Sequence, residues 1–593
     1  MAFCNYPVSG LIIRRVMVIL IPRRRFMNPV GQPLQQRALS KRLLSAGIIG
    51  VLLFALFQIY PQLMSSSPDT DTTVISKSEA KAQAARFAAQ KLGLQADAED
   101  HWGVVYQSDS DFYGYMSREK LLGEYAKQQL DQRYPFDVFH VTLYPASSAV
   151  SNLSVDLNMY TGEPVGFSTQ AETSASGGTG RSTSAGSSPA AASEDAAPLS
   201  LQQQESLARP WLQEWGVNPS KLQIEPGTGD FTLVYSNSSV TIGESRLMYK
   251  FSFSPQGKVN QFKAGFTAPG WHTSYVEDQV TLGTRLNLYG YYLPTIALAL
   301  LALIYSILRR SHTSFARGAF LSVVHFAIMM GSTYNSLPET FSDSPDARLN
   351  ALILFVIYTL FSLLMSLMLY FSLVAGDGLW RKEEGLNPWP RAHEPGYGQY
   401  VLDSIKVGYV WAFVLLGVQS LMFLVLSFTL NNWYTTDPAQ SPFNMKYAWL
   451  LPAVAWLAGL SEEAIYRLFG IRMLQKIVRN TFAACLITTL IWAFGHTLYP
   501  IYPVSSRPIE LTVVGLLFSY IFLRYGFIAA MFSHVVFDSI LIGSSLIFMR
   551  EPVNITAGAV SIILPFLVAY IVYWFNRRRP PAEPFPAARK SLY

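Results

Sequence analysis

The sequence predicts a polytopic α-helical membrane protein of about ten transmembrane helices, with a large extracytoplasmic α+β domain between the first two. Half of the 593 residues are apolar and only 14% are charged, a composition too apolar for an ordinary soluble protein. Apolar runs of membrane-spanning length recur along the chain. A polar region of roughly two hundred residues separates the first run from the second, so it must form a domain outside the bilayer.

The apolar runs that predict spans are each about 17 to 25 residues long. They lie near residues 43–62, 287–308, 318–336, 350–374, 406–429, 447–469, 482–500, 509–523, 526–548 and 556–575. Lys and Arg gather in alternate loops and beside both terminal spans, in segments 1–42 and 576–593. The positive-inside rule places these segments in the cytoplasm. We therefore expect a multi-pass protein of the cell inner (plasma) membrane with both termini cytoplasmic.

The polar region predicts two α+β units and a linker. Residues 65–170 contain an Ala-rich helix pattern and then alternating runs around the Thr-Gly turn of "DLNMYTGEPVGF". Residues 171–199 are rich in Ser, Gly and Ala and are typical of a flexible linker. Residues 200–285 repeat the order of helix, strand, Gly turn and strand. This order resembles PepSY-type modules, which implies a binding or regulatory role; an unrelated ectodomain with two hairpins is the alternative.

Charge and cysteine usage exclude two classes of protein. The two cysteines, Cys4 and Cys485, are far apart in sequence, so the ectodomain is not a disulfide-stapled scaffold. The formal net charge of +6 is small for this length, and the basic residues lie beside apolar runs, where they act as topology signals. We therefore expect the lipid bilayer to be a partner and nucleic acid not to be one.

Ionisable residues inside apolar runs are the first candidates for chemistry, because each costs about 2.5 to 3.5 kcal/mol at mid-bilayer on insertion scales. The stretch "LAGLSEEAIYRLFGIRML" contains Glu462, Glu463 and Arg467. Glu463 precedes Arg467 by four residues, the favourable order for a helical ion pair, whereas Glu462 is turned about 100° away. We predict a structural pair of Glu463 and Arg467, with Glu462 free for chemistry. A cluster at the headgroup level is the alternative.

Three histidines lie within predicted spans. His325 has no acidic neighbour at helical spacing, so we expect it to be a packing residue. His534 lies four residues before Asp538, so both side chains leave one face of their helix. Because neighbouring spans are antiparallel, we expect His496, His534 and Asp538 to meet Glu462 at similar depth.

Three motifs in order carry a family resemblance. "EEAIYR" at 462–467, "WAFGH" at 492–496 and "HVVFD" at 534–538 resemble the CPBP family of intramembrane proteases, which includes the type II CAAX prenyl endopeptidases and the bacteriocin-processing and immunity (Abi) proteins. The resemblance covers residues 405–575, after a region at 287–400 that holds spans two to four and a cytoplasmic loop. Two positions depart from the family: Trp492 stands where phenylalanine is common, and Asp538 where the prenyl endopeptidases carry asparagine.

The resemblance implies hydrolysis of peptide bonds in a membrane-associated protein or peptide, recruited by the ectodomain. Glu462 and His496 would activate water, while His534, oriented by Asp538, would stabilise the oxyanion; Glu463, Arg467 and Trp492 would support them. The set Glu462, His496 and His534 is also similar to the three protein ligands of a catalytic Zn²⁺, so a metal-free glutamate mechanism and a metalloprotease both stay open. The alternative function is a non-catalytic receptor or immunity-type scaffold with an extracytoplasmic sensing domain.

Overall fold

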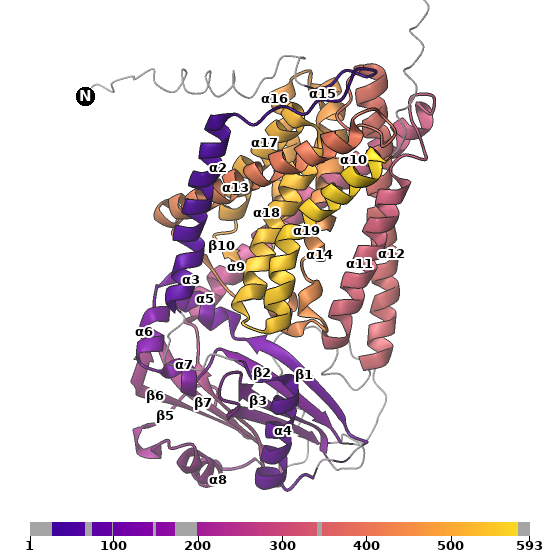
Figure 1. The fold of residues 1–593 in the computed structure, drawn as a ribbon. Helices are drawn as coiled ribbons and strands as arrows, with labels where there is room; N and C mark the ends of the chain where they lie inside the picture. Colours follow the sequence, from indigo (N-terminus) through magenta and orange to yellow (C-terminus); the bar gives the residue numbers. More distant parts are fainter. Residues whose placement is uncertain are drawn as a thin grey trace, which may run out of the picture.

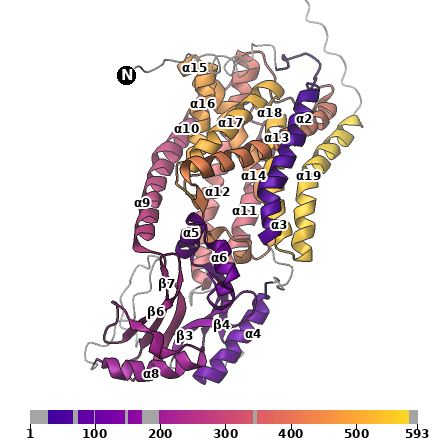
Figure 2. The same ribbon diagram turned by 90° about the vertical axis from the view of Figure 1, so that its left-hand side faces the viewer.

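The computed structural model describes residues 27–65, 74–171 apart from 96, 98 and 146–149, 198–340 and 347–578. A bundle of long helices stands on a domain built around a β-sheet, and the two are joined by α2–α3 and α9–α10 (Figures 1 and 2). Most of the linker predicted at 171–199, together with the first 26 residues and those after 578, lies outside the described residues.

Seven helices of the described residues are long and apolar enough to cross a membrane, so the chain is a multi-pass membrane protein. Several of them contain a π-helical turn. The first is formed by α2 and α3 and the second by α9 and α10, and in each a π-helical turn joins the two parts. Their bounds are α2 Lys41–Phe54, α3 Tyr60–Ser65, α9 Gly270–Leu286, α10 Leu293–Leu308, α12 Ala347–Gly378, α13 Tyr397–Leu430, α17 Ser506–Tyr525, α18 Phe527–Phe548 and α19 Pro552–Arg577.

The three remaining predicted spans are also helical but do not belong to these seven. They correspond to α11 (Ala319–Thr340), to α14 (Ala453–Glu462) with the π-helical segment Glu463–Ile471 that leads into α15 (Arg472–Val478), and to α16 (Thr481–Phe494). Helix α16 has 14 residues, or about 21 Å, which is shorter than a hydrocarbon core of about 30 Å. All ten predicted positions therefore hold helices, of which seven have the length and composition of a full crossing.

Helix α13 is the central element of the bundle. It packs against α2, α17, α18 and α19, and Figure 1 shows it crossing behind α2. The crossing is tight because two glycines meet: a Cβ added to Gly417 would lie 2.4 Å from the Cα of Gly50. Small residues at such a contact let two membrane helices approach closely, which fixes α2 on the outside of the bundle.

The β-sheet domain, which the sequence predicts to be extracytoplasmic and which we call the ectodomain for that reason, is built on one antiparallel sheet of eight strands in the order β1-β2-β3-β4-β8-β7-β6-β5. Its strands are β1 His101–Ser108, β2 Asp137–Tyr144, β3 Val150–Asn158, β4 Pro164–Ala171, β5 Gln223–Ile224, β6 Thr232–Ile242, β7 Ser245–Phe253 and β8 Val259–Phe266. Its helices are α4 Lys77–Phe87, α5 Ser110–Arg118, α6 Leu122–Lys127, α7 Leu130–Arg133 and α8 Leu201–Glu214. Strand β1 and helices α5–α7 were not predicted from the sequence.

The two halves of the ectodomain follow the predicted order of helix and strands. Helices α4 and α8 each begin with a capping box, at Ser76 and Ser200, which marks the start of each half. The hairpins β3–β4 and β7–β8 turn at Gly162 (φ +72°) and Gly257 (φ +75°), a conformation that glycine adopts without strain. Strand β4 pairs with β8, and a single buried core underlies both halves. The halves therefore form one continuous sheet rather than two separate sheets.

A small sheet connects the ectodomain to the bundle. Strands β9 (Trp433–Tyr434) and β10 (Ile501–Tyr502) pair with each other, and β9 packs against α5. The hydroxyl of Thr435, just after β9, donates to the carbonyl of Ser110 in the ectodomain. Because β9 precedes α14 and β10 follows α16, the ectodomain holds both loops that lead to the helices of the candidate site.

Candidate active site

The motif residues lie on three adjacent elements. Helix α14 ends at Glu462 and continues without a break into a π-helical segment, Glu463–Ile471. This segment packs against α16 and α18, the elements that carry the second and third motifs. A π-helical segment is rare and is found most often at functional sites. The site is therefore built where the regular helix gives way to the π-helix.

Glu463 is the buried anchor of the site. Its Oε1 accepts a hydrogen bond from His534 Nδ1 at 2.9 Å and forms an ion pair with Arg467 Nη1 at 3.1 Å. Both members of the ion pair are fully buried. The guanidinium of Arg467 also lies over the ring of Trp492, 4.7 Å from its centroid. The pair expected from the spacing of four is thus present, and it also holds His534.

His534 points its second ring nitrogen at two further carboxylates. Its Nε2 lies 3.5 Å from Asp538 Oδ2 and 3.7 Å from Glu462 Oε2. The ring stacks on Phe518, with centroids 4.5 Å apart. The imidazole is therefore fixed by a carboxylate at Nδ1 and by an aromatic face, while Nε2 is directed to the side where Glu462 and Asp538 remain partly exposed.

Trp492 takes part in the site directly. Its indole Nε1 donates a hydrogen bond to Glu462 Oε2, a contact that phenylalanine could not make. The ring fits because α17 carries Gly515 opposite it: a Cβ added there would lie 2.9 Å from the indole. The family resemblance implied a supporting role for Trp492, but this hydrogen bond was not predicted, because a contact between two helices cannot be deduced from the order of residues.

His496 lies beside this group in a turn. We expected it inside a span at 482–500, but α16 ends at Phe494, so His496 follows the helix. Its Nδ1 donates to the carbonyl of Trp492 at 3.0 Å, which leaves Nε2 available. No hydrogen bond or ion pair between His496 and Glu462 or His534 is found in the described part of the chain. The structure thus brings Glu462, His534 and Asp538 into contact. His496 packs against the ring of Trp492, which lies between it and these three residues.

The turn that carries His496 is held from the ectodomain side of α9–α10. Thr497 donates to the carbonyl of Gly283 at 2.9 Å, and the amide of Asn287 donates to the carbonyl of Gly495 at 3.3 Å. The ring of His496 stacks on Tyr499. The contacts of Thr497 and Gly495 fix the backbone of the turn to helix α9, which follows the last strand of the sheet, and to the π-helical turn after α9. They therefore fix the position of His496 as well.

A second buried charge cluster near the site was missed by sequence reasoning. Arg507 Nη1 donates to Glu510 Oε2 at 2.5 Å, and Gln419 Nε2 donates to Glu510 Oε1 at 2.9 Å. Arg507 also lies over the ring of Tyr499, the residue that stacks on His496. The signal was present in "SSRPIEL", where two opposite charges three residues apart begin an apolar run.

The two histidines resemble metal ligands in one respect only. Each has its Nδ1 fixed by an oxygen, which is common for histidines that bind a metal through Nε2. However, the described residues contain no group of three or more His, Cys, Asp or Glu side chains that could hold a metal ion. Glu462, His496 and His534 are therefore not gathered as a preformed group of metal ligands among the described residues, and the metal-free mechanism is the one developed below.

His325 lies apart from this group. It is buried, and its Nδ1 is 2.9 Å from the hydroxyl of Ser366, the satisfied packing arrangement expected from the sequence.

Comparison with known proteins gives one match. Residues 444–540 match the family model described as "Type II CAAX prenyl endopeptidase Rce1-like". The matched segment is a minority of the chain and includes Glu462, His496, His534 and Asp538. No curated protein and no solved structure matches the chain.

Proposed function

We propose that this protein is an intramembrane endopeptidase that hydrolyses peptide bonds of a membrane-associated protein or peptide. The observation that carries the proposal is the convergence of Glu462, His534 and Asp538, within 4 Å of one another through His534 Nε2, inside a segment that matches an endopeptidase family. Ionisable groups in a membrane bundle are costly and usually functional. The positions of Lys and Arg support an inner-membrane location with both termini cytoplasmic.

In the proposed reaction Glu462 is the general base. Its carboxylate takes a proton from a water molecule, and the water oxygen bonds to the carbonyl carbon of the scissile peptide. The hydrogen bond from Trp492 Nε1 to Oε2 holds one oxygen of this carboxylate. The same proton then passes from Glu462 to the leaving amine as the carbon–nitrogen bond breaks. The Nδ1 of His496 donates to the carbonyl of Trp492, so its Nε2 can accept a hydrogen bond that helps to orient the water.

His534 is the proposed donor to the oxyanion. It can donate from Nε2 while Nδ1 donates to Glu463 only as an imidazolium, because each ring nitrogen then carries a proton. The surrounding Glu462, Glu463 and Asp538 provide the counter-charge. Donors fixed before the reaction stabilise a developing charge more effectively than donors that must rearrange. Glu463 and Arg467 act here as positioning residues, since they hold the imidazole and do not face the substrate side.

The proposal is tested by comparing membrane proteomes of cells that carry the chain with those of cells that carry Glu462→Gln. New protein N-termini should appear with the natural chain and be absent with Glu462→Gln. Glu277→Gln, an exposed residue of α9, is the control and should give the natural pattern. If the natural chain and Glu462→Gln give the same termini, the non-catalytic receptor or scaffold takes the place of the protease. Activity should also survive a chelator, because no step above requires a metal ion.

A further inference from the structure

A lateral groove lies on the side of α14 and α18 away from the motif residues. Its cavity volume is about 960 Å³, and it is bounded by α11, α14, α18, α19 and the loop before α13. This volume is at the upper end of the range of about 300 to 1,000 Å³ typical of small-molecule sites. Two lining side chains, Phe320 and Val560, are 75% and 49% exposed. Because both belong to apolar helices of the bundle, the groove opens toward the bilayer.

The two ends of the groove differ in chemistry. One end contains Trp449, at the ectodomain side of α14, and is apolar. The other end contains Arg317 and Trp389, and there the guanidinium lies over the indole, 3.9 Å from the ring centroid. Among the lining residues Arg317 is the one whose side chain carries a permanent charge. An occupant of this groove must therefore be apolar along most of its length and polar at one end.

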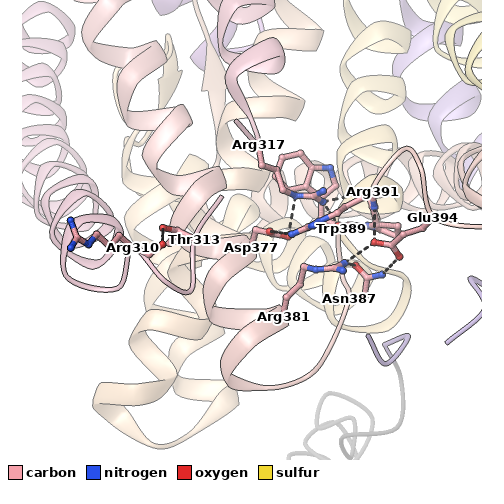
Figure 3. A network of polar contacts seen from close by, with 10 residues as sticks. Arg310, Thr313, Arg317, Asp377, Arg381, Asn387, Trp389, Arg391 and Glu394 are labelled. Carbon is pink, nitrogen blue, oxygen red and sulfur yellow. Dashed lines mark hydrogen bonds and ion pairs between the residues drawn. The ribbon is translucent and has the colours of Figure 1, made fainter. Parts of the chain in front are cut away.

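The polar end belongs to a network of ion pairs (Figure 3). Arg317 Nε lies 3.0 Å from Asp377 Oδ1, and Arg381 Nη1 lies 2.9 Å from Glu394 Oε1. Arg391 is the third arginine of the network. Three arginines face two carboxylates, so the network carries one uncompensated positive charge.

Arg391 is the cation of this network that is least satisfied. Its Nη2 reaches Asp377 Oδ2 only at 3.9 Å, and its Nε, which is itself buried, has no hydrogen-bond partner within the described part of the chain. The side chain is 35% exposed, and Arg391 lies in sequence between Pro390 and Ala392, which both line the groove. A guanidinium has five donors arranged to bind phosphate oxygens, so Arg391 can bind a phosphate at the mouth of the groove.

We propose that the groove binds an anionic glycerophospholipid, with its phosphate at Arg391 and its acyl chains along α14 and α18. The positive-inside pattern places Arg391 at the cytoplasmic leaflet, the leaflet in which basic pockets between membrane helices bind anionic head groups. A phosphate joined to acyl chains matches a groove that is apolar along most of its length and cationic at one end. This proposal does not depend on the proteolytic activity.

The bound lipid also contacts the helices that carry the motif residues. Leu460 lines the groove two residues before Glu462, and Phe532 lines it two residues before His534. Occupancy of the groove therefore fills the space behind α14 and α18, and it supports the arrangement of the two motifs without touching them.

The test uses the full-length chain, purified in mild detergent and incubated with equimolar phosphatidylglycerol and phosphatidylcholine. Native mass spectrometry then counts each lipid that stays bound. The natural chain should retain phosphatidylglycerol in preference, and Arg391→Gln should weaken that retention by about tenfold or more, because it removes a hydrogen bond between charged groups. Lys382→Gln, an exposed residue that precedes the same loop, removes an equal charge and should keep the preference.

A second pair of variants tests the groove itself. Val560→Trp places an indole among the lining residues and should reduce retention of both lipids, whereas Ile563→Trp, exposed on the same helix but outside the lining, should not. Thermal unfolding of each variant without added lipid verifies that it is folded. Equal retention of the two lipids by the natural chain, or equal losses in Arg391→Gln and Lys382→Gln, would overturn the proposal. Crosslinking of position 560 to a protein in cell membranes, with no lipid lost from Val560→Trp, would show instead that the groove binds a partner helix.

Discussion

Replacing Arg467 with methionine should destabilise the bundle severely, because it removes one member of a fully buried ion pair. Arg467 and Glu463 are both 0% exposed, and removing one partner of such a pair costs about 3 to 5 kcal/mol. Methionine has a similar length and can still pack against Trp492 and Phe518, the two rings that Arg467 contacts. We expect a loss of about 3 kcal/mol, the lower end of the range, since Glu463 keeps its hydrogen bond from His534.

A nearby ion pair provides the matched comparison. Arg472, five residues further along the same continuous helix, pairs with Glu384, and their side chains are 15% and 19% exposed. Because this pair is partly exposed, Arg472→Met should cost less than Arg467→Met, about 1 to 2 kcal/mol. The two variants remove the same chemical group and differ mainly in the burial of its partner.

Equilibrium unfolding in mixed micelles with increasing dodecyl sulfate measures these free energies, with tryptophan fluorescence as the signal. The double variant Glu463→Gln/Arg467→Met should be less unstable than the sum of the two single variants, because the residues interact. The reasoning is refuted if Arg467→Met and Arg472→Met lose equal stability, or if the two changes at 463 and 467 are additive.

Three further predictions concern the site, the ectodomain and the orientation. Trp492→Phe removes the indole donor to Glu462 but keeps the ring, so turnover of a cleaved substrate should fall by about tenfold with little change in thermal stability; unchanged turnover would show that this hydrogen bond is not used. Limited proteolysis should cut first within 171–199, and the two fragments should stay associated because β4 pairs with β8; even cleavage across 77–280 would contradict this. Alkaline phosphatase fused after residue 200 should be active and one fused after Arg579 inactive, whereas the opposite result would invert the orientation.

The sequence predicted the structure best where a local pattern, such as an apolar run or a glycine turn, determines a single helix or hairpin. Apolar runs located helices at all ten expected positions, and the two glycine turns marked the two hairpins. The pairing of β4 with β8 was not predictable, since it joins strands on either side of the linker and no local pattern records it. Helix α16 ends at Phe494, before the predicted end of the span, because the apolar pattern extends into a turn whose backbone is fixed by Gly283 and Asn287.

In the candidate site, too, local patterns were predictable and contacts between distant segments were not. Motif order and helical spacing predicted that Glu463 pairs with Arg467 and that His534 and Asp538 share a face. Contacts between helices were not predictable: Glu463, rather than Asp538, holds Nδ1 of His534, and Trp492 donates to Glu462. Glu463 therefore has two functions, as a partner of Arg467 and as the acceptor that orients His534, so changes to it should affect activity as well as stability.

The central claim, that Glu462 is the base that activates water, is tested most directly with purified protein and a substrate identified by the membrane-proteome comparison. Glu462→Gln keeps the size of the side chain and an oxygen that can accept from Trp492 Nε1, but it removes the proton acceptor. Cleavage should fall by about a hundredfold or more, while the protein inserts and unfolds like the natural chain. A folded Glu462→Gln protein that cleaves the substrate at the original rate would contradict the assignment.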